Sequence, residues 1–306
     1  MSYIGIQQQI IRNNTKTTLY LLAFPLLLLA GTYAVLYFVN GQDIQATNQH
    51  FLQAIPFVLI GVSIWFLISY FFNTQMIQTA THSQPLQRRE NMRVYNLTEN
   101  LCMSVGMTMP KLYIIESEAL NAFASGINEK TYAVTLTRGI INTLNDQELE
   151  GVIAHELTHI RNRDVRLLIV TIVFVGIFST IASLAFHGLL NSSLLSSRRK
   201  DEKGGGAVVI MVVIVVAAVI YFFSILFKLA LSRSREYMAD AGAVELTRNA
   251  PALASALRKI SGHSTIDEIR NDEVKELFID YKAKGFFSMF ATHPPINKRI
   301  QVLEQF

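Results

Sequence analysis

Residues 152–160 read VIAHELTHI, and this stretch decides how the rest of the sequence is interpreted. It contains the pattern H-E-x-x-H on a segment with helical apolar periodicity. Spacing of four residues places His155 and His159 on one helix face, one turn apart, where both imidazoles can hold the same Zn²⁺. Glu156 lies beside them and can take a proton from a water molecule on such a metal. The pattern therefore predicts two metal ligands and a general base.

A catalytic zinc site needs a third protein ligand and one open coordination position. The longer pattern that supplies a glycine and a third histidine is excluded, because Asn162 and Val165 stand at those places. The best candidate is Glu236, in the segment SRSREYMADAG at residues 232–242, with Asp240 one turn later to accept a hydrogen bond from a ligating imidazole. The same two carboxylates would also suit a solvated helix that pairs them with neighbouring arginines.

The composition indicates a membrane protein. Hydrophobic residues make up 51% of the 306 residues and charged residues only 16%, which is too apolar for a soluble enzyme of this size. The net charge of +4 is modest and no basic groove with interleaved aromatics is visible, so we expect no nucleic-acid partner. A single cysteine, Cys102, excludes an internal disulfide and is interpreted as a packing residue.

Four stretches are long and apolar enough to cross a bilayer, and none contains Asp, Glu, Lys or Arg: residues 17–40, 51–72, 167–190 and 207–227. Arg12 and Lys16 precede the first span, whereas the loop at residues 41–50 has no basic residue. The positive-inside rule then places the amino terminus and the chain after residue 73 in the cytoplasm. The basic loop at residues 198–203 argues against full crossing by the second pair, although we favour crossing.

We therefore predict a mainly α-helical integral membrane protein with four transmembrane helices and a cytoplasmic α+β domain that contains a small β-sheet. Residues 111–115 and 132–136 have the composition of short strands. Asn145, followed by Glu148, resembles a helix capping box, and residues 251–260 are typical of a helix. The expected organisation is a membrane hairpin at 1–72, half of the polar domain at 73–166, a second hairpin at 167–231 and the other half at 232–306.

The order of the motifs resembles a known family. After H-E-x-x-H and a hairpin come S-R-x-R-E-x-x-A-D-A-G at residues 232–242 and T-H-P-P-x-x-K-R-I at residues 292–300. With two leading spans and NAFASG at residues 121–126, this order resembles the HtpX family of bacterial membrane zinc metalloproteases, and more distantly the CAAX prenyl proteases. The resemblance covers nearly the whole chain and implies a zincin-like (gluzincin) protease domain with one Zn²⁺.

The resemblance also implies roles for individual residues. His155, His159 and Glu236 match the zinc ligands, Glu156 the catalytic base, and Asp240 the partner of a ligand. Four further residues match positions near the substrate: Asn121 and Ala122, which would bind an extended substrate by strand addition, and His293 and Arg299, which would stabilise the oxyanion or hold substrate. From the residues alone, Asn121 is equally a turn residue and His293, before two prolines, a loop residue.

The function implied is zinc-dependent peptide hydrolysis in the quality control of membrane proteins, a stress response at the bacterial inner membrane. The expected partners are membrane-protein or unfolded polypeptide substrates, the lipid bilayer and, in a homo-oligomer, other copies of the chain. Three alternatives are weighed against this reading. A transporter is disfavoured because the four spans carry no charged residue. A catalytically weak adaptor or chaperone would not need an intact site, and a prenyl-protein protease resembles a longer chain with more spans.

Overall fold

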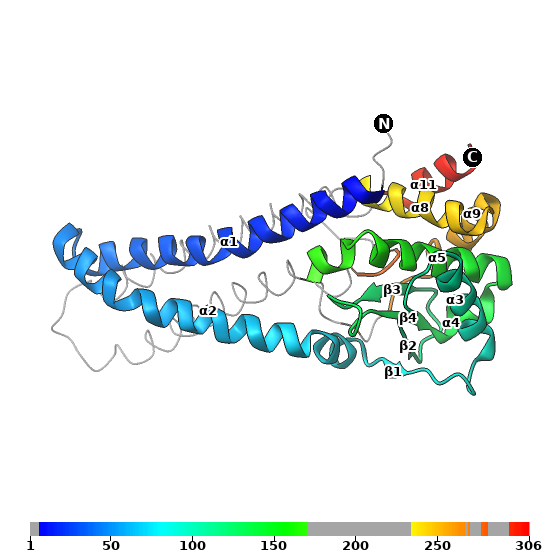
Figure 1. Cartoon of the computed structure of the whole chain (residues 1–306), viewed down its shortest axis with the longest axis horizontal. Coiled ribbons are helices and arrows are strands. Elements are labelled where there is room, and N and C mark those ends of the chain that lie inside the picture. The colour runs from blue at the N-terminus through cyan, green and yellow to red at the C-terminus, as the bar shows by residue number, and fades with distance from the viewer. Residues whose placement is uncertain (1–5, 170–233, 267–268, 270–276, 281–293, 306) are drawn as a thin grey trace. The chain divides into compact units, whose positions relative to one another are not determined.

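The computed structural model of the chain describes residues 6–169, 234–266, 269, 277–280 and 294–305 (Figure 1). The predicted span at 207–227 and nearly all of the span at 167–190 fall outside the described residues, as does His293.

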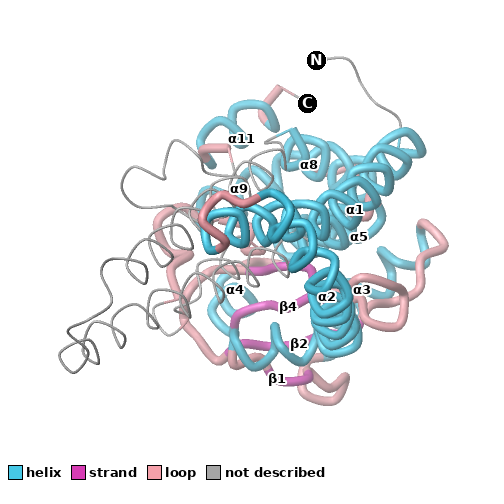
Figure 2. The backbone as a smooth tube through the Cα atoms, turned by 90° about the vertical axis from the view of Figure 1, so that its left-hand side faces the viewer, coloured by secondary structure: helices cyan, strands magenta, loops and turns pink. Residues whose placement is uncertain are grey.

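A small mixed sheet contains four strands: β1 (Gln84–Pro85), β2 (Lys111–Ile115), β4 (Ala133–Thr137) and β3 (Ala122–Ser125), in that spatial order (Figure 2). Strands β2 and β4 are parallel, whereas β1 and β3 run antiparallel to their neighbours. The predicted strand at 111–115 is confirmed, and the one predicted at 132–136 begins and ends one residue later. Strand β3 is too short and alanine-rich to show the alternation that identifies a strand.

Helix α5 (Asp146–Arg161), which carries H-E-x-x-H, is the centre of the packing. It contacts α3 (Met92–Ser104), α8 (Ser234–Thr247), α9 (Ala250–Ile260) and the strands β3 and β4. Every residue of α5 from Gly151 to Thr158 is buried, which is possible only because partners surround it. The structure also contains α4 (Arg138–Thr143) and α11 (Ile296–Leu303), and α9 confirms the helix predicted at 251–260.

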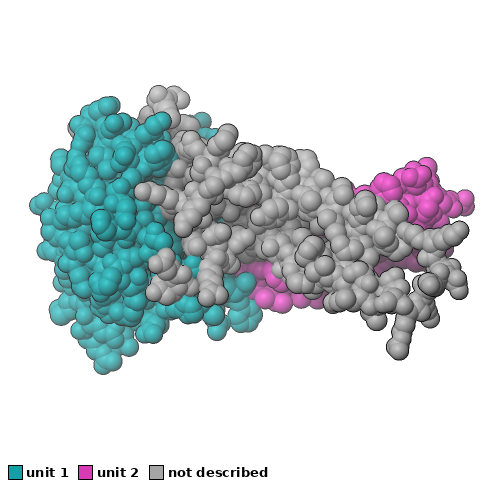
Figure 3. All heavy atoms as spheres, turned by 180° about the vertical axis from the view of Figure 1, so that it is seen from behind, with its two compact units in different colours: residues 1–16, 71–169, 229–306 teal, residues 17–70, 170–228 magenta. Residues whose placement is uncertain are grey.

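The chain divides into two compact units (Figure 3), one formed by residues 1–16, 71–169 and 229–306 and the other by residues 17–70 and 170–228. Among the described residues, α1 (Ile6–Val39) and α2 (Ile44–Thr81) are long and apolar enough to cross a membrane. Many of their large apolar side chains are exposed, with Leu26 65%, Leu52 69% and Phe57 77% exposed. Exposed apolar surface of this kind is typical of helices that face lipid.

The first two predicted spans coincide with α1, which ends one residue before the predicted end of the first span, and α2, but both helices are longer than the apolar stretches. Helix α2 begins at Ile44, inside the segment predicted as a loop to residue 50. The reason is local, because the Asp43 side chain accepts hydrogen bonds from the backbone N–H groups of Gln45 (2.8 Å) and Ala46 (3.2 Å) and so caps the helix. Tyr33 then packs edge-on against Phe51, with ring centroids 5.1 Å apart, and so joins the two helices.

The predicted capping box at the start of α5 is confirmed, and its glutamate also contacts a second helix. The backbone N–H of Asn145 donates to Glu148 Oε2 at 2.9 Å, while the Asn145 side chain accepts from the Glu148 N–H. Glu148 also accepts a hydrogen bond from Ser255 Oγ (2.7 Å) and forms an ion pair with Lys259 Nζ (2.6 Å); both partners lie on α9. This one carboxylate therefore fixes both the start of α5 and its packing against α9.

Glu148→Gln should lower the free energy of unfolding by about 1–2 kcal/mol, the range for losing a cap together with a partly exposed ion pair. Burial opposes ionisation, but Lys259, Ser255 and the Asn145 N–H outweigh it and lower the pKa of Glu148 below its ordinary value. Stability from this carboxylate is thus present above its ordinary pKa of about 4.3 and lost as the pH falls through the lower folded-state pKa. Thermal unfolding in detergent should show a variant deficit that is constant from pH 8 to about pH 5 and narrows below about pH 4.

The matched control is Glu118→Gln, because Glu118 is an exposed carboxylate in the same unit. An equal loss of stability in both variants, or a deficit at Glu148 that does not change with pH, would contradict this account of the α5–α9 contact.

Candidate metal centre

Helix α5 buries two histidines on one face. His155 is fully buried and the side chain of His159 is 12% exposed. Their Nε2 atoms lie 3.2 Å apart, and the rings are perpendicular with centroids 4.7 Å apart. The four-residue spacing of the motif therefore brings both imidazoles to a single point.

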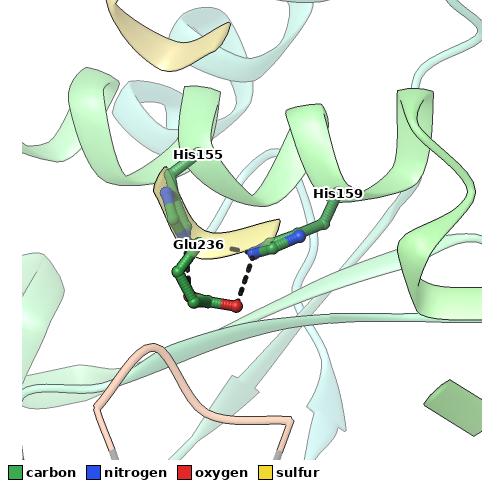
Figure 4. A group of neighbouring side chains, drawn as sticks. All are labelled: His155, His159 and Glu236. Carbon is green, nitrogen blue, oxygen red and sulfur yellow. Dashed lines mark hydrogen bonds and ion pairs between the residues drawn. The ribbon is translucent and has the colours of Figure 1, made fainter. Parts of the chain in front are cut away.

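Helix α8 supplies a third polar group at the same point (Figure 4). The Glu236 carboxylate places Oε2 3.6 Å from His155 Nε2 and Oε1 3.6 Å from His159 Nε2. The three potential ligand atoms lie within 4.8 Å of one another, and Glu236 is only 1% exposed. Two imidazoles and one carboxylate are a common ligand set of catalytic zinc sites that keep one position open.

The close approach of α8 to α5 depends on a glycine. A Cβ atom at Gly242 would lie 2.4 Å from Thr158 Cγ2, far inside van der Waals contact. Thr158 is buried beside His159 on α5, and Gly242 lies on α8 after Glu236 and Asp240. The missing side chain thus allows α8 to pack closely enough for its carboxylates to reach the histidines.

The second nitrogen of each imidazole faces its own carboxylate. His155 Nδ1 lies 3.0 Å from Asp240 Oδ1, and His159 Nδ1 lies 3.1 Å from Asp164 Oδ2. A carboxylate at Nδ1 holds the ring proton there and leaves the Nε2 lone pair free for a cation. In that tautomer the two Nε2 lone pairs point at each other and at Glu236, an arrangement that a divalent cation stabilises.

Sequence reasoning assigned a role to Asp240 but missed Asp164. Asp164 is 1% exposed and lies just beyond the end of α5, after Arg163 in a left-handed conformation with φ of 59°. The turn breaks the helical spacing, so periodicity gives no reason to pair Asp164 with His159. The only sequence signal was an acidic residue shortly after the motif.

Arg299 is held inside the protein. Its guanidinium donates to both oxygens of Asp240, from Nε at 2.9 Å and from Nη2 at 2.7 Å, and from Nη1 to the Ile279 carbonyl at 3.0 Å. Nη1 also lies 3.6 Å from Glu236 Oε2, and the residue is 1% exposed. Sequence reasoning placed Arg299 at the substrate or oxyanion, and that role stays a prediction. In the structure the guanidinium contacts the carboxylates around the histidines, and its Nη2 lies 3.3 Å from His155 Nε2.

The buried charges shift the protonation of the site. Burial would lower the pKa of His159, but Glu236 and Asp164 raise it to about 10, so a cation at this ring replaces a proton. Burial raises the pKa of Glu156, which is 2% exposed, above its ordinary value, while the two histidines oppose the increase. A carboxylate with a raised pKa is the more effective proton acceptor near neutral pH.

The predicted substrate segment begins strand β3 at the edge of the sheet. Asn121 is buried, and its Nδ2 donates to the carbonyls of Ser264 (2.8 Å) and Asp280 (3.2 Å). The Ala122 carbonyl accepts a hydrogen bond from the Ile279 N–H at 2.9 Å. An extended substrate that pairs at Ala122 must therefore replace Ile279 or pair farther along β3.

Comparison with known proteins places these features in a family. Residues 88–306 match the model for peptidase family M48. A protein called Protease HtpX homolog from Bacteroides fragilis is 52% identical over the full length of both chains, and its namesake from Lactobacillus helveticus is 35% identical over 98% of this chain and 99% of its own. The crystal structure of S. mikatae Ste24p matches 97% of this chain and 66% of its own, with a TM-score of 0.46 and 18% identity.

Gly242→Ala should separate α8 from α5 and weaken zinc binding, measured by competition with a chelating dye. Alanine is intrinsically about 1 kcal/mol better than glycine in a helix, so a loss of stability would have to come from the clash with Thr158. Adding Thr158→Ala should restore much of the affinity, because it removes the atom that the new Cβ meets.

The control is Glu245→Ala, an exposed position on the same helix. Unchanged zinc affinity in Gly242→Ala, or no recovery in the double variant, would contradict the role given to this contact.

Proposed function

Because the chain belongs to peptidase family M48, we propose that His155, His159 and Glu236 bind one zinc ion and that Glu156 activates water for the hydrolysis of peptide bonds. The protein is a membrane-bound metalloprotease. The observation that most directly supports this site is the convergence of two Nε2 atoms and one carboxylate, with each ring's Nδ1 facing an aspartate.

When bound, zinc supplies Lewis-acid chemistry that polarises the scissile carbonyl and acidifies water. The residues of the chain do the rest. Glu156 takes a proton from the attacking water and passes it to the leaving amine, a transfer that its raised pKa favours. Asp240 and Asp164 hold the two imidazoles in the tautomer that turns Nε2 toward the ion. His293, which the family resemblance implicates, would donate to the developing oxyanion.

The proposed substrates are membrane proteins and unfolded polypeptides, cleaved as part of quality control. An extended backbone would add to β3, an outer strand of the sheet, by taking the place of Ile279, whose N–H donates to the Ala122 carbonyl. Recognition through backbone groups suits a protease that acts on unfolded segments of many sequences.

We further propose that the chain crosses the bacterial inner membrane four times, with the peptidase unit in the cytoplasm. The apolar surfaces of α1 and α2 support the first two crossings. Arg12 and Lys16 before the first span, and the absence of basic residues at 41–50, support the orientation. A site on the cytoplasmic side would meet exposed loops of neighbouring membrane proteins.

The central test is proteolysis of casein by the full-length protein in detergent, with bound zinc quantified in parallel. Wild type should cleave and a chelator should stop it. Glu156→Gln should keep zinc and lose activity by at least about 10²-fold, because general base catalysis is lost. Glu236→Gln should lose zinc. The control Glu150→Gln, on α5 with Glu156, should behave as wild type.

The outcomes of this experiment distinguish the proposed protease from the alternative functions. Zinc bound by wild type and Glu156→Gln without cleavage of any protein offered would favour the adaptor alternative. Preference for a farnesylated peptide over an unmodified membrane protein would favour the prenyl-protein protease. Absence of zinc from wild type would refute the assigned ligands.

Orientation can be tested with single cysteines in a Cys102→Ala background and a membrane-impermeant maleimide on intact spheroplasts. Cys102 itself should react little with the maleimide, because it is 2% exposed and burial raises the pKa of its thiol to about 11. Gln45→Cys should react from outside, whereas Lys130→Cys should react only after permeabilisation. The reverse pattern would overturn the cytoplasmic placement.

A further inference from the structure

The first helix reaches the metal centre through a buried asparagine. Asn13 lies on α1 before its apolar stretch, in the same compact unit as α5, and is 2% exposed. Its Nδ2 group donates one hydrogen bond to the Asn162 carbonyl at 2.9 Å and another to Asp164 Oδ1 at 2.6 Å. Both acceptors belong to the turn that follows the H-E-x-x-H helix.

The two oxygens of Asp164 face different partners. Oδ1 accepts from Asn13, and Oδ2 lies 3.1 Å from His159 Nδ1. A carboxylate held at one oxygen cannot rotate freely, so the orientation of the other oxygen toward the imidazole depends on the first contact. Asn13 also holds the backbone of the turn at Asn162, next to the left-handed Arg163 that presents Asp164.

We propose that Asn13 is a positioning residue of the metal centre, which acts through Asp164 on His159. The first membrane helix would then supply part of the peptidase site and not only an anchor. This inference rests on the proposed role of His159 as a metal ligand. An asparagine side chain suits the task that we assign to residue 13. A neutral amide gives two donors without adding charge beside Asp164, Glu236 and Asp240, whereas a carboxylate there would repel Asp164.

A structural role alone would give Asn13 a different signature. A residue that only joins α1 to α5 would change thermal stability but leave the affinity and ligand geometry of the metal as they were. Loss of a positioning residue changes the metal affinity and the ligand geometry. Its effect disappears once the side chain at position 164 is no longer a carboxylate that contacts His159.

The test uses Co²⁺ as a spectroscopic probe in the full-length protein in detergent. Asn13→Ala should weaken Co²⁺ binding by about tenfold, the lower end of the range for residues that orient ligands, and should alter the visible d–d absorption. Asn13→Asp, of nearly the same shape, should weaken it more. Thr15→Ala is the control, because Thr15 is exposed on the same helix and its hydroxyl bonds only to the Ile11 carbonyl among the contacts observed.

The decisive comparison is the pair Asn13→Ala and Asp164→Asn, alone and combined. The double variant should bind Co²⁺ about as weakly as Asp164→Asn alone, because the two residues act in series. Multiplied losses in the double variant, or wild-type affinity and spectrum in Asn13→Ala with only its unfolding temperature lowered, would overturn the proposal. Failure of the ligand assignment itself is distinct, since wild type and Glu236→Gln would then bind Co²⁺ equally.

Discussion

The structure depends on two imidazole nitrogens held 3.2 Å apart inside a protein. Each ring has a carboxylate at its other nitrogen, so both lone pairs are directed into the same small space. Such an arrangement suits a metal cation, and the surrounding fold holds the three side chains together. The capping box fixes where α5 begins, α9 and the sheet enclose the helix, and Gly242 lets α8 approach with its carboxylates.

Charge balance explains why so many ionisable groups are tolerated in one buried region. Glu156, Glu236, Asp240 and Asp164 are each at most 3% exposed, and Arg299 with the proposed metal dication would offset most of their charge. Burial favours the neutral form of Asp240, but Arg299 and His155 lower its pKa so that it stays ionised. Arg299 is therefore part of the site. Among the described residues it also contacts the Ile279 carbonyl and the His155 ring.

Local patterns in the sequence predicted those features that depend on interactions between residues close together in the chain. The capping box at Asn145, the strand at 111–115, the helix at 251–260 and the meeting of His155 with His159 all follow from residues a few positions apart. Contacts across the chain were less accessible. Asp164 pairs with His159 across an irregular turn, Asn13 reaches Asp164 from 151 residues away, and Arg299 reaches Asp240 from 59 residues away. No periodicity encodes these contacts, so the three side chains that meet were anticipated and most of the residues that orient them were not.

The peptidase unit is assembled from three separate stretches of chain, residues 1–16, 71–169 and 229–306. During synthesis the histidines leave the ribosome first, Glu236 follows only after residues 170–228, and Arg299 comes almost last. Because chains leave the ribosome amino terminus first, a nascent molecule lacks the third member of the group, Glu236, until residues 170–228 have been made. The order of these residues along the chain thus delays formation of the complete site until late in translation.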